Sequence, residues 1–281
     1  MRLLRIKVLT ALALAVFTLA AHAMGPDTGN PAASARMTPN PRYFKHCFSD
    51  AGYMLTRPLS WGASDWLKFS LVVGVTATLA DEDEDIQVWV ETRRNAGTAR
   101  VAGVAKSFGD GTYIVPAFGA LYCFGYLSGS GRARRTALLG LESLAIAGVF
   151  TEVIKHTAHK HRPVYGGVEE VAWDGPSFSR VHRSFPSGHS AAAFAAATVV
   201  ASEYGNYAFV TPLMYSAATL CALSRMHDDA HWLSDIVIGS LIGHLVARTV
   251  VDLNGGPSGG GLSLTPVMRE RGVGVSMSYR F

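Results

Sequence analysis

Three short blocks of the sequence combine residue types that can bind and cleave a phosphate group. The first block contains Lys155 and Arg162 and ends at Pro163. Lys155 and Arg162 are seven positions apart, so two helical turns bring both cations to one face. Arginine adds a planar fork that grips two oxygens of one phosphate. The block predicts a site for a multivalent anion, with a basic helix end that complements its own dipole as the simpler alternative.

The second block spans residues 184–190 and includes Pro186, Ser187, Gly188 and His189, followed by a run of small apolar residues. Proline fixes φ where a helix begins, serine caps free amides, and glycine lets the backbone approach a ligand. The helix N-terminus predicted here favours an anion. His189 stands at its edge, where it can give a proton to a leaving oxygen. The alternative is an ordinary capped helix with a surface histidine.

The third block contains Arg225, His231 and Asp235. His231 and Asp235 are four positions apart at the start of a predicted helix, so the carboxylate can accept the Nδ1–H of His231. This contact fixes the tautomer and leaves Nε2 free as a nucleophile. Arg225 supplies a third cation. Together the blocks predict attack of His231 on phosphorus, protonation of the leaving group by His189, and hydrolysis of a phosphohistidine by water.

Histidine clusters in two of the blocks also permit a metal site, which we consider the weaker interpretation. The first block contains His156, His159 and His161, but their neighbours are cations rather than carboxylates or cysteines. His227 and His231 are four positions apart, but they lack the glutamate of the zinc-binding His-Glu-x-x-His pattern. We expect neither a metal nor another cofactor, because fixed cations can neutralise the phosphate charge.

The three blocks resemble the signature of the type 2 phosphatidic acid phosphatase and vanadium haloperoxidase superfamily, namely Lys-x6-Arg-Pro, Pro-Ser-Gly-His and Ser-Arg-x5-His-x3-Asp. All eleven signature residues are present in order, and the flanking stretches are similar to the membrane-bound lipid phosphatase branch. The resemblance implies a bundle of six main helices in which His231 is the nucleophile, His189 the general acid and Asp235 the partner of His231. The phosphate-binding residues that it implies are Lys155, Arg162, Ser187, Gly188 and Arg225.

Apolar stretches predict the helices that must position these blocks, because they are too long for strands and rich in alanine and leucine. They cover residues 66–80, 113–127, 136–154, 190–202, 207–223 and 232–251. An amphipathic helix is expected over residues 86–107, and the five acids at 81–85 are interpreted as its solvated cap. With 49% hydrophobic and 16% charged residues, the chain is typical of a membrane protein. We therefore predict an all-α bundle of about six main helices, embedded in a membrane, with helices buried against one another as the alternative.

The N-terminus predicts entry into the cell envelope. A basic start, an apolar core and a small-x-small cleavage site indicate a secretory signal peptide over residues 1–23, with an uncleaved anchor as the alternative. We expect a linker over 24–60 and a phosphatase helical domain over 61–254. The basic loop at 128–135 should face the cytoplasm, which puts Lys155 and the active site on the periplasmic side.

The C-terminal residues 255–281 predict a glycine-rich linker followed by a short β-hairpin. Their alternation and the final Phe281 resemble the last strand of an outer-membrane barrel. A single hairpin does not close a barrel, so we interpret it as an appendage.

These observations predict a metal-independent phosphatase of a bacterial-type cell envelope that acts on a lipid phosphate monoester or diphosphate. Three alternatives stay open: a soluble-type, nonspecific periplasmic acid phosphatase, a vanadate-dependent haloperoxidase, and a non-catalytic envelope protein that binds phosphate. The net charge of +4 is modest and no basic run carries interleaved aromatic residues, so we expect no nucleic-acid partner. Cys47, Cys123 and Cys221 are scattered and show no metal-binding spacing.

Overall fold

The structure is a computed structural model, and its regular secondary structure between residues 38 and 256 is helical wherever it is described. The predicted all-α class is therefore confirmed for this part of the chain. The expected signal peptide over 1–23 lies outside the described residues, as does most of the segment between the first and second blocks. The described residues are 38–166, 173, 175–176, 183–256, 261–269 and 272–280.

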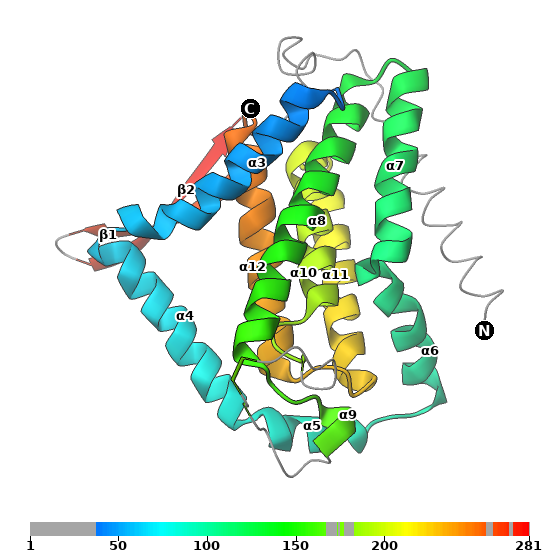
Figure 1. The fold of residues 1–281 in the computed structure, drawn as a ribbon, viewed down its shortest axis with the longest axis vertical. Coiled ribbons are helices and arrows are strands. Elements are labelled where there is room, and N and C mark those ends of the chain that lie inside the picture. Colours follow the sequence, from blue (N-terminus) through cyan, green and yellow to red (C-terminus); the bar gives the residue numbers. More distant parts are fainter. Residues whose placement is uncertain are drawn as a thin grey trace.

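The centre of the molecule is a group of long helices that run side by side (Figure 1). Helix α10 (Gly188–Tyr204) packs against α8 (Gly131–Ala158), α11 (Val210–His227) and α12 (Leu233–Leu253). Helix α7 (Gly111–Leu127) packs mainly against α8. These five helices form over most of the length of five predicted apolar stretches.

Aliphatic side chains from α8, α10 and α12 make the main core. Leu139, Val199 and Val250 are fully buried in one cluster, and burying each is worth about 1.5–3 kcal/mol. The backbones of α10 and α12 come so close that a Cβ at Gly243 would collide with the carbonyl oxygen of Ala191. Small residues at such a contact allow two helices to pack tightly.

The linker expected over residues 24–60 is wrong for residues 41–60, which are helical. Helix α3 (Pro41–Thr56) is followed by the 3₁₀ helix η1 (Arg57–Ser60). The side chain of Asn40 accepts hydrogen bonds from the backbone N–H groups of the second and third helical residues, and a proline occupies the first position. Tyr43 is buried in the main core, so α3 belongs to the folded body.

Helix α4 (Ala63–Asp81) contains the predicted stretch 66–80 but stands apart from the central helices along most of its length (Figure 1). No residue of α4 is buried by the described part of the chain. Leu67 and Leu71 are 63% and 67% exposed. A helix that is apolar all round normally lies in a protein core or in a membrane. The described part of the chain does not bury α4, so its apolar surface fits contact with a membrane.

The single helix expected over residues 86–107 is wrong, because two helices form there. Helix α5 (Asp83–Glu91) is followed by α6 (Ala96–Ala105) and by the 3₁₀ helix η2 (Lys106–Gly109). The break occurs at Asn95, whose side chain accepts hydrogen bonds from two backbone N–H groups of the next turn and caps α6. Asparagine favours such caps over a helix interior.

Two helices of the described chain are long and apolar enough to cross a membrane, namely α8 and α12. About half of the apolar window of α8 and 39% of that of α12 are buried inside the protein. Length and composition alone therefore fit both a membrane span and a core helix.

Beyond α12 the chain has two strands, β1 (Gly261–Arg269) and β2 (Gly272–Arg280). They pair antiparallel, with Gly261 opposite Arg280 and Arg269 opposite Gly272. Their side chains and the turn between them lie outside the described residues. The role of this segment as an appendage stays a prediction.

Candidate active site

The three blocks meet at one end of the central helices, the lower end in Figure 1. The first block follows from the C-terminal end of α8, and the second forms the N-terminal end of α10. The third block connects the C-terminal end of α11 to the N-terminal end of α12. Because neighbouring helices alternate in direction, four helix ends bring these segments together although they are far apart in sequence.

The second block forms the predicted helix N-terminus and contacts both of the other blocks. The side chain of Ser187 caps α10, and its backbone N–H donates to the carbonyl oxygen of Asp235 at 3.0 Å. A Cβ at Gly239 would collide with the backbone of Ser187, so glycine permits this contact. A Cβ at Gly188 would lie 3.3 Å from Lys155 Nζ, so the glycine leaves the lysine ammonium next to the helix N-terminus.

The first block is less helical than predicted. Helix α8 ends at Ala158, because His159 adopts a left-handed conformation with φ of 50°. Arg162 therefore lies beyond the helix, and the argument that it shares a helical face with Lys155 is wrong. The charges of both residues still act on His231, so the two cations are close to the same site.

Two arginines of the site are held in place by neighbouring oxygen acceptors. Arg162 Nη2 donates to the carbonyl oxygen of Arg183 at 3.3 Å. Arg225 Nη1 donates to Asp228 Oδ2 at 3.2 Å. The Nε of Arg225 is buried and has no hydrogen-bond partner among the described residues. A buried donor of this kind is costly to leave unpaired, which is consistent with a site that takes up an anion.

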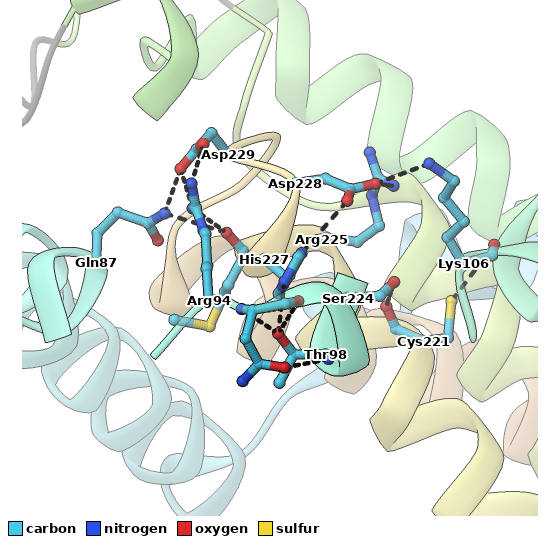
Figure 2. Close-up of polar contacts among 12 residues, drawn as sticks. Gln87, Arg94, Thr98, Lys106, Cys221, Ser224, Arg225, His227, Asp228 and Asp229 are labelled. Carbon is cyan, nitrogen blue, oxygen red and sulfur yellow. Dashed lines mark hydrogen bonds and ion pairs between the residues drawn. The ribbon is translucent and has the colours of Figure 1, made fainter. Parts of the chain in front are cut away.

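Figure 2 shows how the segment between α11 and α12 is held around Arg225. Asp228 accepts from Lys106 Nζ at 2.9 Å as well as from Arg225. Burial alone would raise the pKa of Asp228, but the hydrogen bond and charge of Lys106 hold it below its usual range. Asp229 pairs with Arg94, whose Nη1 lies 2.6 Å from Asp229 Oδ2. Helix α6 and its neighbours therefore fix the third block from outside the signature.

His231 is buried beside Asp235, as the spacing predicts, and its Nδ1 lies 3.6 Å from Asp235 Oδ2. That separation is longer than a hydrogen bond, and Nδ1 has no hydrogen-bond partner within the described chain. Burial, together with the charges of Arg162 and Lys155, lowers the pKa of His231 to about 4, although Asp235 opposes the shift. The imidazole is therefore neutral at pH 7, the form that can act as a nucleophile.

His189 lies in the first turn of α10, in the electrostatic range of His231. Burial lowers its pKa to about 4, and the neighbouring charges of Arg225 and Lys155 act in the same direction. The carboxylate of Asp110 opposes them. A group held neutral by cations is one that a bound anion returns toward its protonated form.

Sequence reasoning missed two buried charges next to Asp235. Lys160 Nζ lies 2.6 Å from Asp83 Oδ2 and 3.1 Å from Asp235 Oδ1. All three side chains are fully buried. The interpretation of the acids at 81–85 as a solvated cap is therefore wrong for Asp83. Lys160 lies inside the first block, which is the only sequence signal that pointed toward it.

Two other histidines of the blocks, His156 and His227, have hydrogen-bond partners of their own. His156 Nδ1 lies 2.7 Å from the carbonyl oxygen of Glu152, and His227 Nε2 lies 3.1 Å from the hydroxyl of Thr98. Among the described residues, no three His, Cys, Asp or Glu side chains are placed to hold a metal ion together.

Comparisons with known proteins match the region that contains the three blocks. Residues 136–255 match the PAP2 superfamily. A PA-phosphatase related-family protein from Dictyostelium discoideum is 35% identical over 137 residues, which cover 42% of this chain and 48% of that protein. The lipid A 1-phosphatase of Porphyromonas gingivalis is 39% identical over 66 residues, which cover 23% of this chain and 15% of that protein. This chain thus spans about half the length of the first relative, and less of the second.

Among solved structures, a transmembrane PAP2 type phosphatidylglycerolphosphate phosphatase from Bacillus subtilis is 17% identical. It aligns over 66% of this chain and 94% of its own, with a TM-score of 0.49. All three signature blocks fall inside the matched residues 136–255. The predicted resemblance to the PAP2 superfamily is therefore confirmed over residues 136–255.

Proposed function

We propose that this protein is a metal-independent phosphatase that hydrolyses lipid phosphate monoesters or diphosphates through a phosphohistidine. The observation that carries the proposal is the meeting of two neutral histidines, His231 and His189, with the cations of all three blocks at one end of the bundle. The names of the relatives, a PA-phosphatase related-family protein and a lipid A 1-phosphatase, support the same class of reaction.

The reaction has two steps in which the histidines exchange protons. In the first, His231 Nε2 attacks phosphorus while the bond from phosphorus to the leaving oxygen breaks. His189, protonated in the presence of the substrate anion, gives its proton to that oxygen. In the second step His189 removes a proton from water, which attacks phosphorus and breaks the bond to His231. Inorganic phosphate leaves, and both histidines return to their starting states.

Fixed positive charges stabilise the transition states of both steps. We assign phosphate binding to the cations and to the N-terminus of α10, where the backbone N–H groups point toward an anion. The residues with this role are Lys155, Arg162, Ser187, Gly188 and Arg225. We assign to Asp235 the task of holding the tautomer of His231 and stabilising the charge that forms on it.

The apolar exterior supports a lipid substrate and residence in a membrane. Helix α4 turns large apolar side chains outward, and α8 and α12 are long enough to span a bilayer. We propose that the helices sit in a membrane of the cell envelope, that residues 1–23 direct the chain there, and that the active site faces the periplasm. The basic loop expected over residues 128–135 is wrong from residue 131 on, because α8 begins at Gly131. Its three arginines lie at the start of α8, and this basic helix end favours the same orientation.

The test is phosphate release by the purified full-length chain in detergent micelles that contain EDTA. The substrates are a lipid phosphate, a lipid diphosphate and a soluble aryl phosphate, and the reference is His231→Ala. We expect release from the lipids that EDTA leaves unchanged and that His231→Ala abolishes. Preference for the aryl phosphate would instead indicate a nonspecific acid phosphatase. An intact protein that releases phosphate from none of the three would overturn the proposal.

A further inference from the structure

We propose that Lys160 and Asp83 are positioning residues that hold the Asp235 carboxylate, and through it His231, in the geometry needed for phosphoryl transfer. The inference rests on the proposed function, because it assigns these two residues a part in that reaction. Neither belongs to the eleven signature residues, and Asp83 lies outside the matched residues 136–255.

Lys160 is held by three oxygen acceptors. Its Nζ donates to Asp83 Oδ2 at 2.6 Å, to Ser234 Oγ at 2.8 Å and to Asp235 Oδ1 at 3.1 Å. An ammonium group has three N–H donors, so every donor is used. The rings of Trp173 and Trp232 lie within 6 Å of the same nitrogen. The charge is therefore fixed in one place.

The two oxygens of Asp235 have different neighbours. Oδ1 accepts from Lys160, whereas Oδ2 accepts from the backbone N–H of Trp232 at 2.9 Å and from the Ser184 hydroxyl. Oδ2 is also the oxygen that faces His231 Nδ1. Because Lys160 holds Oδ1, the carboxylate keeps the rotation that turns Oδ2 toward the histidine.

Asp83 connects this arrangement to the first turn of α12. Its Oδ1 accepts from the backbone N–H of Ser234 at 2.9 Å, and its Oδ2 accepts from the Ser234 hydroxyl at 2.6 Å. A carboxylate at a helix N-terminus interacts favourably with the helix dipole. Asp83 belongs to α5, so an element upstream of the matched residues completes the support of the active site.

The arrangement also balances charge. Two buried carboxylates share one ammonium, and without it their mutual repulsion favours the protonated form of one of them. A protonated Asp235 is a poor partner for the positive charge that develops on His231. Besides Lys160, the charges of His231 and Lys155 act on Asp235. The charge of Arg162 acts in turn on His231 and on Lys155. The lysine therefore keeps Asp235 ionised as well as oriented.

The test compares pH profiles of kcat for Lys160→Met and Asp83→Asn, with the substrate that the unmodified protein hydrolyses fastest. For Lys160→Met we expect kcat to fall roughly 100-fold, less than the about 10⁴-fold seen when a triad aspartate is neutralised. KM should change little, because the Lys160 ammonium bonds to Asp83, Ser234 and Asp235, and none of these three is assigned to phosphate binding. The acidic limb should move to higher pH by about one unit, because a carboxylate that loses its cation takes up a proton more readily.

Asp83→Asn should also lower kcat. The acidic limb of its pH profile should move to lower pH or stay in place, because Asp235 then shares the Lys160 ammonium with no other carboxylate. The matched control is Arg135→Met, which breaks a buried ion pair to Glu203, with an N–O distance of 3.1 Å, at the opposite end of the bundle. We expect this control to lower Tm and to leave the pH profile unchanged. Opposite shifts in the two site variants distinguish positioning from mere stabilisation of the fold.

Two results separate the inference from the function on which it rests. An active His231→Ala would overturn the proposed function. An inactive His231→Ala, with site variants whose acidic limbs match the unmodified protein or move together, would overturn the positioning role alone. If thermal unfolding shows that Lys160→Met does not fold, the isosteric Asp83→Asn decides: a normal kcat, or a limb moved to higher pH, overturns the inference.

Discussion

At the scale of single residues, burial and neighbouring cations favour the neutral forms of His189 and His231, and the proposed mechanism needs a bound anion to reverse this for His189. His189 has a pKa of about 4, lowered by burial and by neighbouring cations such as Arg225. The bound phosphate group of a substrate adds negative charge at this point, which favours the protonated imidazole. In the proposed mechanism, the substrate thus favours the protonated form of its own general acid, His189.

This account predicts that inorganic phosphate raises the pKa of His189 from about 4 toward the ordinary value near 6.5. The measurement is an NMR titration of protein labelled at histidine, with and without saturating phosphate. His189→Gln identifies the signal by its loss. A pKa of His189 that stays near 4 in saturating phosphate would contradict the mechanism.

The buried His231 makes stability depend on pH. Its pKa is about 4 in the fold and close to 6.5 in the unfolded chain, so the unfolded state binds more protons between these values. The contribution of His231 to the free energy of unfolding is therefore complete above about pH 6.5 and is lost as the pH falls toward 4. A shift of this size is worth on the order of 3 kcal/mol.

A change from pH 7 to pH 5 should therefore lower Tm more in the unmodified protein than in His231→Ala, which has no imidazole to protonate at this position. Thermal unfolding at the two pH values measures the difference. His189→Ala provides a second comparison, because that histidine shifts in the same direction. Equal losses of Tm in all three proteins would show that neither histidine is held neutral by the fold.

The signature residues could be recognised from the sequence, whereas the charges that support them could not. The four-residue spacing of His231 and Asp235 predicts their proximity, and the structure brings them together. Asp83 lies among five consecutive acids, and nothing in such a run tells which carboxylate turns inward. Its partner Lys160 is 77 positions away, so only the folded chain reveals the pair.

At the scale of elements, the apolar stretches predicted helices well, and local capping decided what the stretches could not. His159 ends α8 through its left-handed conformation, four residues before Pro163. Asn95 divides the helix expected over 86–107, and Asn40 caps helix α3, which lies inside the expected linker. The two asparagines act through side-chain hydrogen bonds and His159 through its backbone dihedral angles, and hydrophobic periodicity reports neither.

The contact between α10 and α12 predicts that two helical glycines respond oppositely to alanine. At Gly243 a Cβ would collide with the carbonyl oxygen of Ala191, so Gly243→Ala should destabilise the protein by about 1–3 kcal/mol. Gly74 of α4 has no described atom within 4 Å of such a Cβ. Gly74→Ala should therefore be neutral or stabilising by up to about 1 kcal/mol, because alanine favours helix.

Thermal unfolding in the same detergent measures both variants. The pair controls for helix propensity, since both substitutions replace a glycine within a helix. A Gly243→Ala protein as stable as Gly74→Ala would contradict the close packing of α10 against α12.

At the scale of the whole molecule, the fold separates a polar end from an apolar exterior. The three blocks meet at the end of the bundle that also carries α5 (Figure 1), whereas α4 presents apolar side chains along its length. A lipid phosphate has the same division, with a charged head and apolar chains. Composition predicted this character, but the separation of α4 from the central helices has no counterpart in the sequence pattern.

The central claim is that phosphate is transferred to His231, and a rapid-quench experiment with lipid phosphate labelled with ³²P tests it most directly. The full-length protein is quenched in base during turnover, and the label is located by mass spectrometry of its peptides. We predict an acid-labile, base-stable phosphate on His231 in the unmodified protein and no label in His231→Ala. Turnover without any labelled histidine, or label that persists in His231→Ala, would contradict the account.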